Sequence, residues 1–176
     1  MSTNAIAASL INYIEDLLVN KNILDTSKIF LLMDYADMTY KSQTYYSLMN
    51  EGKIDEAFAE PDIPKPWVED ILTYAYRIGI KISIYTSRVT TDRVKEKCDW
   101  IMKTKEVPGL FHSYICIRRE DRVLPISEVL TPELIPQDER NILVLFCDFA
   151  SRMKAFEDAD LSRYCGEKHT VTLNEN

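Results

Sequence analysis

Short apolar runs alternate with helical patterns along this chain, and that alternation limits the possible folds more than any other feature. The runs are KIFLLMD (28–34), KISIYTSR (81–88), SYICI (113–117) and NILVLF (141–146). A run that is apolar at every position is typical of a strand covered on both faces, as in a parallel sheet. We therefore expect these four segments to form the centre of one sheet.

Helical patterns precede or separate these runs. Over residues 5–19, apolar residues recur at intervals of three and four residues, as in an amphipathic helix. The same intervals begin at Trp67 and end at Gly79, a residue that suits a C-cap. Further helices are expected after Thr90 or Thr91 and over residues 150–160, and the alternating segment 169–173 suits an edge strand. Strands that alternate with helices predict an α/β three-layer, Rossmann-like fold with a mainly parallel five-stranded sheet.

The segment 35–66 interrupts this alternation. It is polar, rich in Tyr and punctuated by Pro, so we expect an irregular loop with a short helix near residues 54–59. No linker composition or internal repeat divides the chain. We interpret residues 1–176 as a single domain, with an N-terminal helix within 1–25 and a short insert in place of a large cap.

Composition narrows the class of protein. The 176 residues carry a formal charge of -7, which opposes tight, unspecific binding to nucleic acid. No apolar run is long enough to span a membrane, and the acidic N-terminal helix does not resemble a secretory signal. The four cysteines form no CxxC pair, so we expect reduced thiols, a cytoplasmic location and no zinc.

Polar residues follow each of the four apolar runs. They are Asp34 after the first, Thr86, Ser87 and Arg88 after the second, Arg118 and Arg119 after the third, and Asp148 after the fourth. Parallel strands bring these ends to one edge, where open α/β sheets bind ligands. Carboxylates, hydroxyls and guanidinium groups together suit a phosphate with Mg²⁺, although each residue also fits an ordinary cap or a solvated loop.

The order of IFLLMD, ISIYTSR and ILVLFCD resembles the haloacid-dehalogenase-like (HAD) phosphatase superfamily, and over residues 28–165 most of all the 3′-phosphatase domain of phage polynucleotide kinases. The resemblance implies Asp34 as the nucleophile that forms an aspartyl-phosphate. It implies Thr86 as the phosphoryl contact, with Ser87, Arg88 and Arg119 as further phosphate ligands. Asp34 and Asp148 would hold Mg²⁺, and a viral origin would place the protein in a host cytoplasm.

The chain departs from that family's motifs at two positions that matter for the rate. The expected acid/base at position 36 is Ala36, although Asp37 follows and a bulge would present it instead. The expected Lys of the third motif is missing, so Arg118, Arg119 or Arg122 would have to replace it. Loss of an acid/base lowers a rate by about 10²–10⁴-fold.

Two functions follow from this combination. The first is weak, Mg²⁺-dependent hydrolysis of a phosphomonoester, on nucleotides or nucleic-acid 3′ ends, with Asp34, Asp37, Thr86 and Arg118 as catalytic residues. The second is a catalytically degenerate relative that binds a protein or a nucleotide. In that case the Tyr-rich segment 35–60 is the expected surface for a protein partner. The sequence leaves the oligomeric state and the substrate open.

Overall fold

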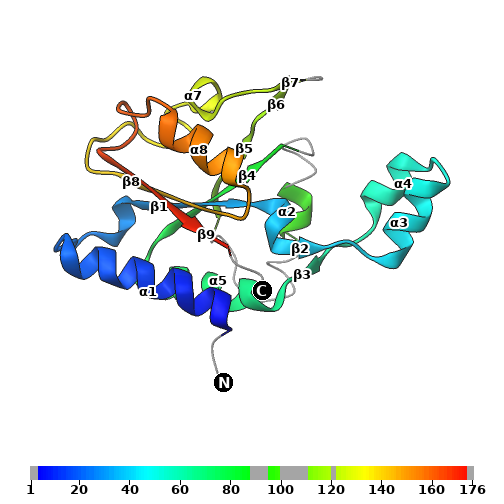
Figure 1. Ribbon diagram of the computed structural model, residues 1–176, viewed down its shortest axis with the longest axis horizontal. Helices are drawn as coiled ribbons and strands as arrows, with labels where there is room; N and C mark the ends of the chain where they lie inside the picture. Colours follow the sequence, from blue (N-terminus) through cyan, green and yellow to red (C-terminus); the bar gives the residue numbers. More distant parts are fainter. Residues whose placement is uncertain (1–3, 88–94, 100–110, 120–121, 174–176) are drawn as a thin grey trace.

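The computed structural model describes residues 4–87, 95–99, 111–119 and 122–173, and the side chain of Arg119 lies outside this description (Figure 1). Arg88 and most of the helix expected after Thr90 also fall outside the described residues. Of that helix, residues 95–99 are described and helical.

The centre of the fold is a five-stranded sheet in the order β5-β4-β1-β8-β9. The strands are β1 (Ile29–Asp34), β4 (Lys81–Thr86), β5 (Phe111–Cys116), β8 (Ile142–Cys147) and β9 (Glu167–Thr172). Every neighbouring pair is parallel. The predicted Rossmann-like α/β fold with five strands is thereby confirmed, and the C-terminal segment forms the expected edge strand.

Helices cover both faces of this sheet (Figure 1). On one face, α1 (Ala5–Asn20) and α5 (Pro66–Ile78) pack against Leu31 and Ile84, among other residues. On the other face, α7 (Ile126–Val129) and α8 (Ala150–Asp158) pack against Leu32 and Leu145. Because successive strand residues point to opposite faces, each apolar run contributes to two cores, which explains why apolar residues predominate in the runs.

Local sequence explains where the helices begin and end. The Asn4 side chain accepts a hydrogen bond from the Ile6 amide and caps α1. Helix α5 begins at Pro66, which suits a first helical position. It ends at Gly79, whose φ of 78° is the left-handed conformation that glycine adopts without a steric penalty. The predicted C-cap at Gly79 is confirmed.

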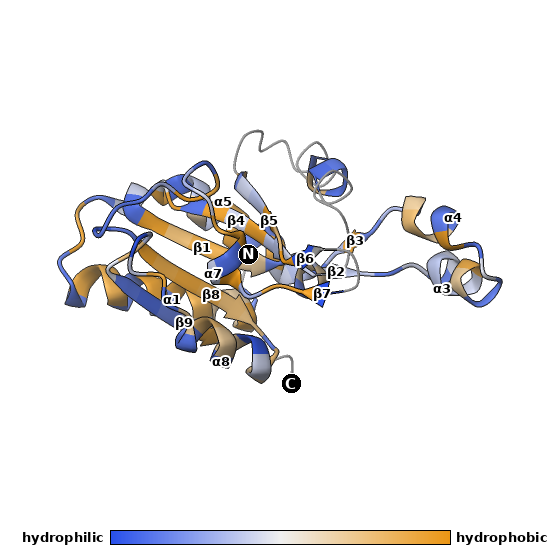
Figure 2. Cartoon of the chain, turned by 90° about the horizontal axis from the view of Figure 1, so that it is seen from above, coloured by the Kyte–Doolittle hydropathy of each residue, from blue (hydrophilic) through white to orange (hydrophobic). Residues whose placement is uncertain are grey.

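The segment after β1 is more regular than we expected. It contains α2 (Tyr35–Met38), β2 (Thr39–Tyr40), α3 (Gln43–Asn50), α4 (Ile54–Ala59) and β3 (Ile63–Pro64). The short helix at 54–59 was predicted, whereas the prediction of an irregular loop over 43–50 was wrong. Strands β2 and β3 form an antiparallel stalk that carries α3 and α4 away from the sheet (Figure 2).

The segment between β5 and β8 contains only short elements, as its prolines indicate. Strands β6 (Arg118–Arg119) and β7 (Arg122–Val123) form a hairpin before α7. In the part of the chain that the structure describes, no helix is long and apolar enough to cross a membrane.

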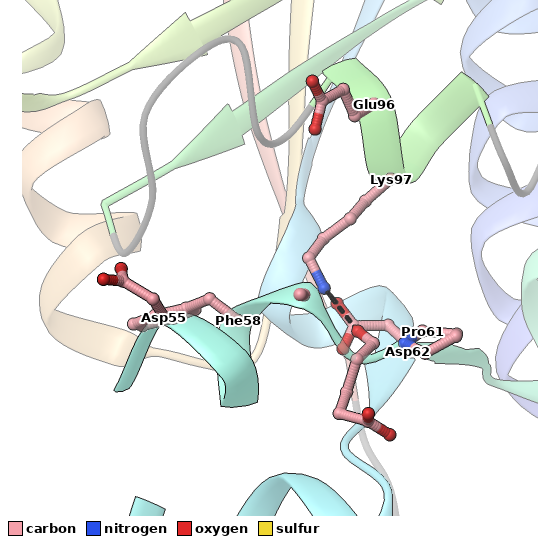
Figure 3. Close-up of a pocket in the computed structure, with 8 residues that line it drawn as sticks. Asp55, Phe58, Pro61, Asp62, Glu96 and Lys97 are labelled. Carbon is pink, nitrogen blue, oxygen red and sulfur yellow. Dashed lines mark hydrogen bonds and ion pairs between the residues drawn. The ribbon is translucent and has the colours of Figure 1, made fainter. Parts of the chain in front are cut away.

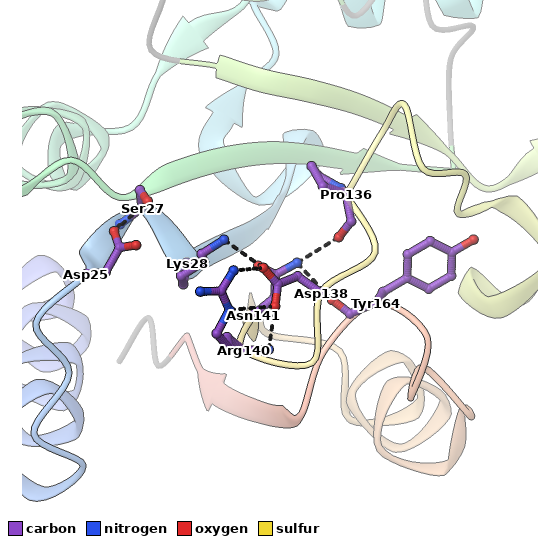
Figure 4. A network of polar contacts seen from close by, with 8 residues as sticks. All are labelled: Asp25, Ser27, Lys28, Pro136, Asp138, Arg140, Asn141 and Tyr164. Atoms are coloured by element: carbon purple, nitrogen blue, oxygen red, sulfur yellow. Dashed lines mark hydrogen bonds and ion pairs between the residues drawn. The ribbon is translucent and has the colours of Figure 1, made fainter.

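A polar network joins loops near the amino ends of β1 and β8, including the short helix η1 (Thr26–Lys28) (Figure 4). The Asp138 carboxylate lies 2.7 Å from Lys28 Nζ and 2.7 Å from Arg140 Nη2. The buried Asn141 amide donates to the carbonyls of Pro136 and Tyr164, at 2.7 and 2.9 Å. These polar groups are hydrogen-bonded or paired with one another, which indicates a structural role for this end of the sheet.

Candidate functional site

The carboxyl ends of β4, β1 and β8 lie side by side and bring three of the predicted residues to one edge. Asp34 ends β1, Thr86 ends β4, and Asp148 directly follows β8. Strand β1 pairs with β4 on one side and with β8 on the other. The convergence predicted from the strand ends therefore follows from the observed strand order.

Asp34 is buried, and both of its carboxylate oxygens are engaged. Oδ1 accepts a hydrogen bond of 2.8 Å from the Ala36 amide, so the side chain caps α2. Oδ2 forms an ion pair with the Arg152 guanidinium. The guanidinium offsets the cost of removing this carboxylate from water.

Arg152 contacts the candidate site but was not predicted from the sequence. It lies in α8, and its Nη2 donates to Ser87 Oγ at 3.3 Å. Its guanidinium carbon lies 5.5 Å from the ring centre of Tyr85 and 5.0 Å from that of Phe149. Burial lowers the pKa of Arg152. Arg152 lies in the helix that follows β8 and not at a strand end, which is where the polar residues were expected. Its place in the first turn of that helix is the sequence signal that could have identified it.

The arginines expected to replace the missing Lys lie elsewhere. Arg118 is exposed on the β6–β7 hairpin, and Arg119 pairs there with Arg122 through the backbone. Arg122 Nη2 lies 3.3 Å from Glu128 Oε2 in an exposed ion pair. Among the residues that the structure describes, the cation paired with Asp34 is Arg152.

Asp37 stands next to Asp148. The single turn of α2 after Asp34 brings the Asp37 carboxylate, Cys147 Sγ and the Asp148 carboxylate within 4.8 Å of one another. Asp37 is only 4% exposed, and its Oδ2 has no hydrogen-bond partner among the described residues. Burial, followed by the charge of Asp148, raises the pKa of Asp37 to about 6.

Cys147 contributes a thiol rather than a thiolate to this cluster. Burial raises its pKa to about 12, and its sulfur accepts a hydrogen bond of 3.3 Å from the Phe149 amide. A cysteine sulfur is a soft ligand, so for a hard cation the donors in this cluster are the carboxylate oxygens. Hard cations such as Mg²⁺ and Ca²⁺ prefer oxygen ligands of this kind.

The carboxyl end of β4 supplies two hydroxyl groups, those of Thr86 and Ser87. Thr86 is buried, and its carbonyl accepts a hydrogen bond of 2.9 Å from the Ile117 amide, which holds the end of β4 against the next segment. Ser87 is half-buried and contacts Arg152, as described above. The structure therefore connects Ser87, Arg152 and Asp34 in one chain of contacts.

A pocket of about 390 Å³ opens beside Arg152. Ser87 and Arg152 lie on its polar side, and Ile117, Ile126 and Phe156 belong to its apolar wall. A second pocket, of about 350 Å³, lies between α4 and residues 95–99 (Figure 3).

In the second pocket, Lys97 Nζ lies 3.2 Å from Asp62 Oδ2 and 2.9 Å from the Glu60 carbonyl. The carboxylates of Asp55 and Glu96 point away from this pair (Figure 3). The ion pair joins the insert to the rest of the fold. The polar residues at the strand ends, Asp34, Thr86 and Asp148, are not among the described residues that line this pocket.

Comparison with known protein families finds no family model that matches this chain, and comparison with curated proteins finds no significant match.

Proposed function

We propose that this protein hydrolyses a phosphomonoester with the help of Mg²⁺, at the carboxyl edge of the sheet. The observation that carries the proposal is the buried Asp37 beside Asp148. A carboxylate with an unpartnered oxygen, held next to a second acid, is costly unless a cation or a proton balances the charge. In HAD phosphatases, which the order of strand-end residues resembles, acids at this edge hold Mg²⁺.

The donor set suits Mg²⁺. Asp37 and Asp148 offer oxygens, and Mg²⁺ is usually bound by one or two carboxylates together with water and substrate phosphate. Asp148 was expected in this role with Asp34, but the Asp34 oxygens are engaged by Arg152 and the Ala36 amide, so we assign the partner of Asp148 as Asp37. When bound, the ion would neutralise charge on the phosphoryl oxygens.

The side chains of this site suit two steps. In the first, an oxygen of Asp34 attacks phosphorus, the bond to the ester oxygen breaks, and an aspartyl-phosphate forms. As a ligand of the ion, Asp37 carries no proton, so water rather than the acid expected from the sequence protonates the departing oxygen. In the second step, water attacks phosphorus and gives its proton to the surrounding solvent, which releases orthophosphate and restores Asp34.

Arg152 affects this reaction in two opposing ways. Its charge suits the phosphoryl group, together with the hydroxyls of Thr86 and Ser87. However, the same guanidinium holds Asp34 Oδ2, so the ion pair must open before that oxygen can attack. We therefore expect slow turnover.

The occupied Asp34 also favours a second candidate function, a binding module without catalysis. The helices α3 and α4 project from the sheet and expose Tyr46, Met49 and Ile54, which suits a protein partner for the segment 35–60. Substitutions on that surface would abolish partner binding and leave phosphate binding intact.

The test is release of orthophosphate from a 3′-phosphorylated oligonucleotide and from an aryl phosphate, with and without Mg²⁺. We expect release that requires Mg²⁺ and that is lost in Asp34→Asn. Asp158→Asn is the matched control, because Asp158 is exposed on α8 and pairs with Lys154. No release from either substrate by folded protein would reject the hydrolase and favour the binding module.

A further inference from the structure

The pocket beside Arg152 has two chemically different ends. Its polar end contains Ser87, Ser151 and Arg152, close to the Asp34 ion pair. Its apolar end includes Ile117, Ile126 and Phe156, all buried residues of the sheet and its covering segments. A pocket that is mostly apolar and has a few polar groups at one end is typical of a small-molecule site.

The charge of this pocket does not suit a polymer of phosphates. Among the described residues that line it, the cation is Arg152, and the buried carboxylate of Asp34 balances its charge. Proteins that hold nucleic acid neutralise several phosphates with Lys and Arg, and this chain has a formal charge of -7. When the ion pair with Asp34 opens, Arg152 offers one positive charge to the pocket, which suits a ligand with a single anionic group.

The size and walls of the pocket limit the rest of that ligand. The volume of about 390 Å³ lies near the lower end of the range for small-molecule sites. The side chains of Leu124, Pro125 and Phe156 present apolar surface. Burial of this surface against a ring of the ligand would stabilise the complex. The Arg152 guanidinium already stacks on aromatic rings at the boundary between the two ends.

We infer that the substrate is a compact phosphomonoester of an aromatic or similarly flat apolar alcohol, rather than a nucleic-acid end. This inference rests on the proposed hydrolysis. The phosphoryl group lies at the end that contains Ser87 and Arg152, and the alcohol occupies the apolar end and leaves from there with its proton.

The test fills the apolar end with a larger side chain. Ala155 lines the pocket and is exposed on α8, so Ala155→Trp adds bulk to the pocket without displacing a buried residue. Ala5→Trp is the matched control, because Ala5 is exposed at the start of α1, outside the pocket. Two readouts are used: the affinity for benzylphosphonate measured by calorimetry, and the ratio of kcat/KM for phenyl phosphate over methyl phosphate.

We expect the unmodified protein and Ala5→Trp to bind benzylphosphonate and to prefer phenyl phosphate. In Ala155→Trp, both the affinity and the preference should fall by at least about tenfold. Equal hydrolysis of phenyl and methyl phosphate, or a preference for a 3′-phosphorylated oligonucleotide, would overturn the inference and leave the proposed hydrolysis intact. Absence of hydrolysis with every substrate would overturn both.

Discussion

Two buried aspartates within the segment 35–66 have opposite surroundings. Asp62 is 2% exposed; its Oδ2 accepts a hydrogen bond of 2.7 Å from the Tyr35 hydroxyl, and its carboxylate lies 2.7 Å from Lys41 Nζ and 3.2 Å from Lys97 Nζ. Asp37 is 4% exposed, and its neighbours are the acid Asp148 and a protonated thiol.

The difference separates a carboxylate with a structural role from one that we propose to have a functional role. Asp62 joins the stalk of the insert to the rest of the fold, and its partners compensate for the loss of water around its charge. Burial, and the hydrogen bond that the Tyr35 hydroxyl donates to this carboxylate, hold the pKa of Tyr35 well above its usual value. Asp37 has one oxygen, Oδ2, without a hydrogen-bond partner among the described residues, and it faces the charge of Asp148, so a deprotonated Asp37 lowers the stability of the cation-free fold.

The largest effect on stability is expected at Asp62. Asp62→Asn removes a charge that faces two lysines and should lower the free energy of unfolding by about 2–4 kcal/mol, because buried ion pairs are costly to break from one side. Urea unfolding at pH 7.5 measures this change. Asp55→Asn, at an exposed position of α4, is the control. An effect of Asp62→Asn no larger than that of the control would mean that the network is not a structural connection.

Asp37→Asn should change stability in the opposite direction. Without a divalent cation at pH 8, we expect the free energy of unfolding to rise by about 1–3 kcal/mol, because Asn keeps the shape of the side chain and removes the repulsion by Asp148. Urea unfolding in EDTA measures this gain. A loss of stability at pH 8 would mean that the Asp37 carboxylate is compensated in a way that the structure does not explain.

The gain in stability expected for Asp37→Asn should also depend on pH. The pKa of Asp37 is raised from its usual 3.8 to about 6. Between these values the unfolded carboxyl loses its proton before the folded one, so the stability of the unmodified protein decreases as pH rises through this range. Asp37→Asn lacks this contribution. The difference between the two proteins should be absent near pH 4, increase to about pH 6 and remain constant above it.

The exposed pair of Arg122 and Glu128 should have the smallest effect. Their side chains are 73% and 54% exposed, so Glu128→Gln should change the free energy of unfolding by less than about 0.5 kcal/mol. Urea unfolding in low and high salt measures this change. A loss of more than about 1 kcal/mol would show that exposure is a poor guide to the strength of ion pairs in this molecule.

The sheet was predictable because apolar residues dominate the strands around its centre. The runs at 28–34 and 141–146 correspond to β1 and β8, which are buried on both faces. Helix α3 was not predictable in the same way. None of its residues is fully buried, and its apolar repeat of Tyr45, Leu48 and Met49 spans little more than one turn among polar residues, too short to indicate a helix. The cap formed by Ser42 on the Tyr45 amide is the local signal that remains.

The site was predictable only where its residues end strands. Asp34, Thr86 and Asp148 were found because parallel strands end at one edge. The position of Asp37 depends on the turn of α2, which the sequence suggested only as a bulge. Arg152 lies in a helix, and its ion pair with Asp34 is a contact between distant residues that no local pattern encodes.

The central claim is that Asp37 and Asp148 form a site for Mg²⁺, and calorimetric titration of the metal-free protein with Mg²⁺ at pH 7.5 tests it most directly. We expect the unmodified protein and Asp158→Asn to bind one ion. We expect the affinity to be at least about tenfold weaker in Asp37→Asn, because one of the two carboxylate ligands is lost. Equal binding heats in the unmodified protein and in Asp37→Asn would contradict the claim.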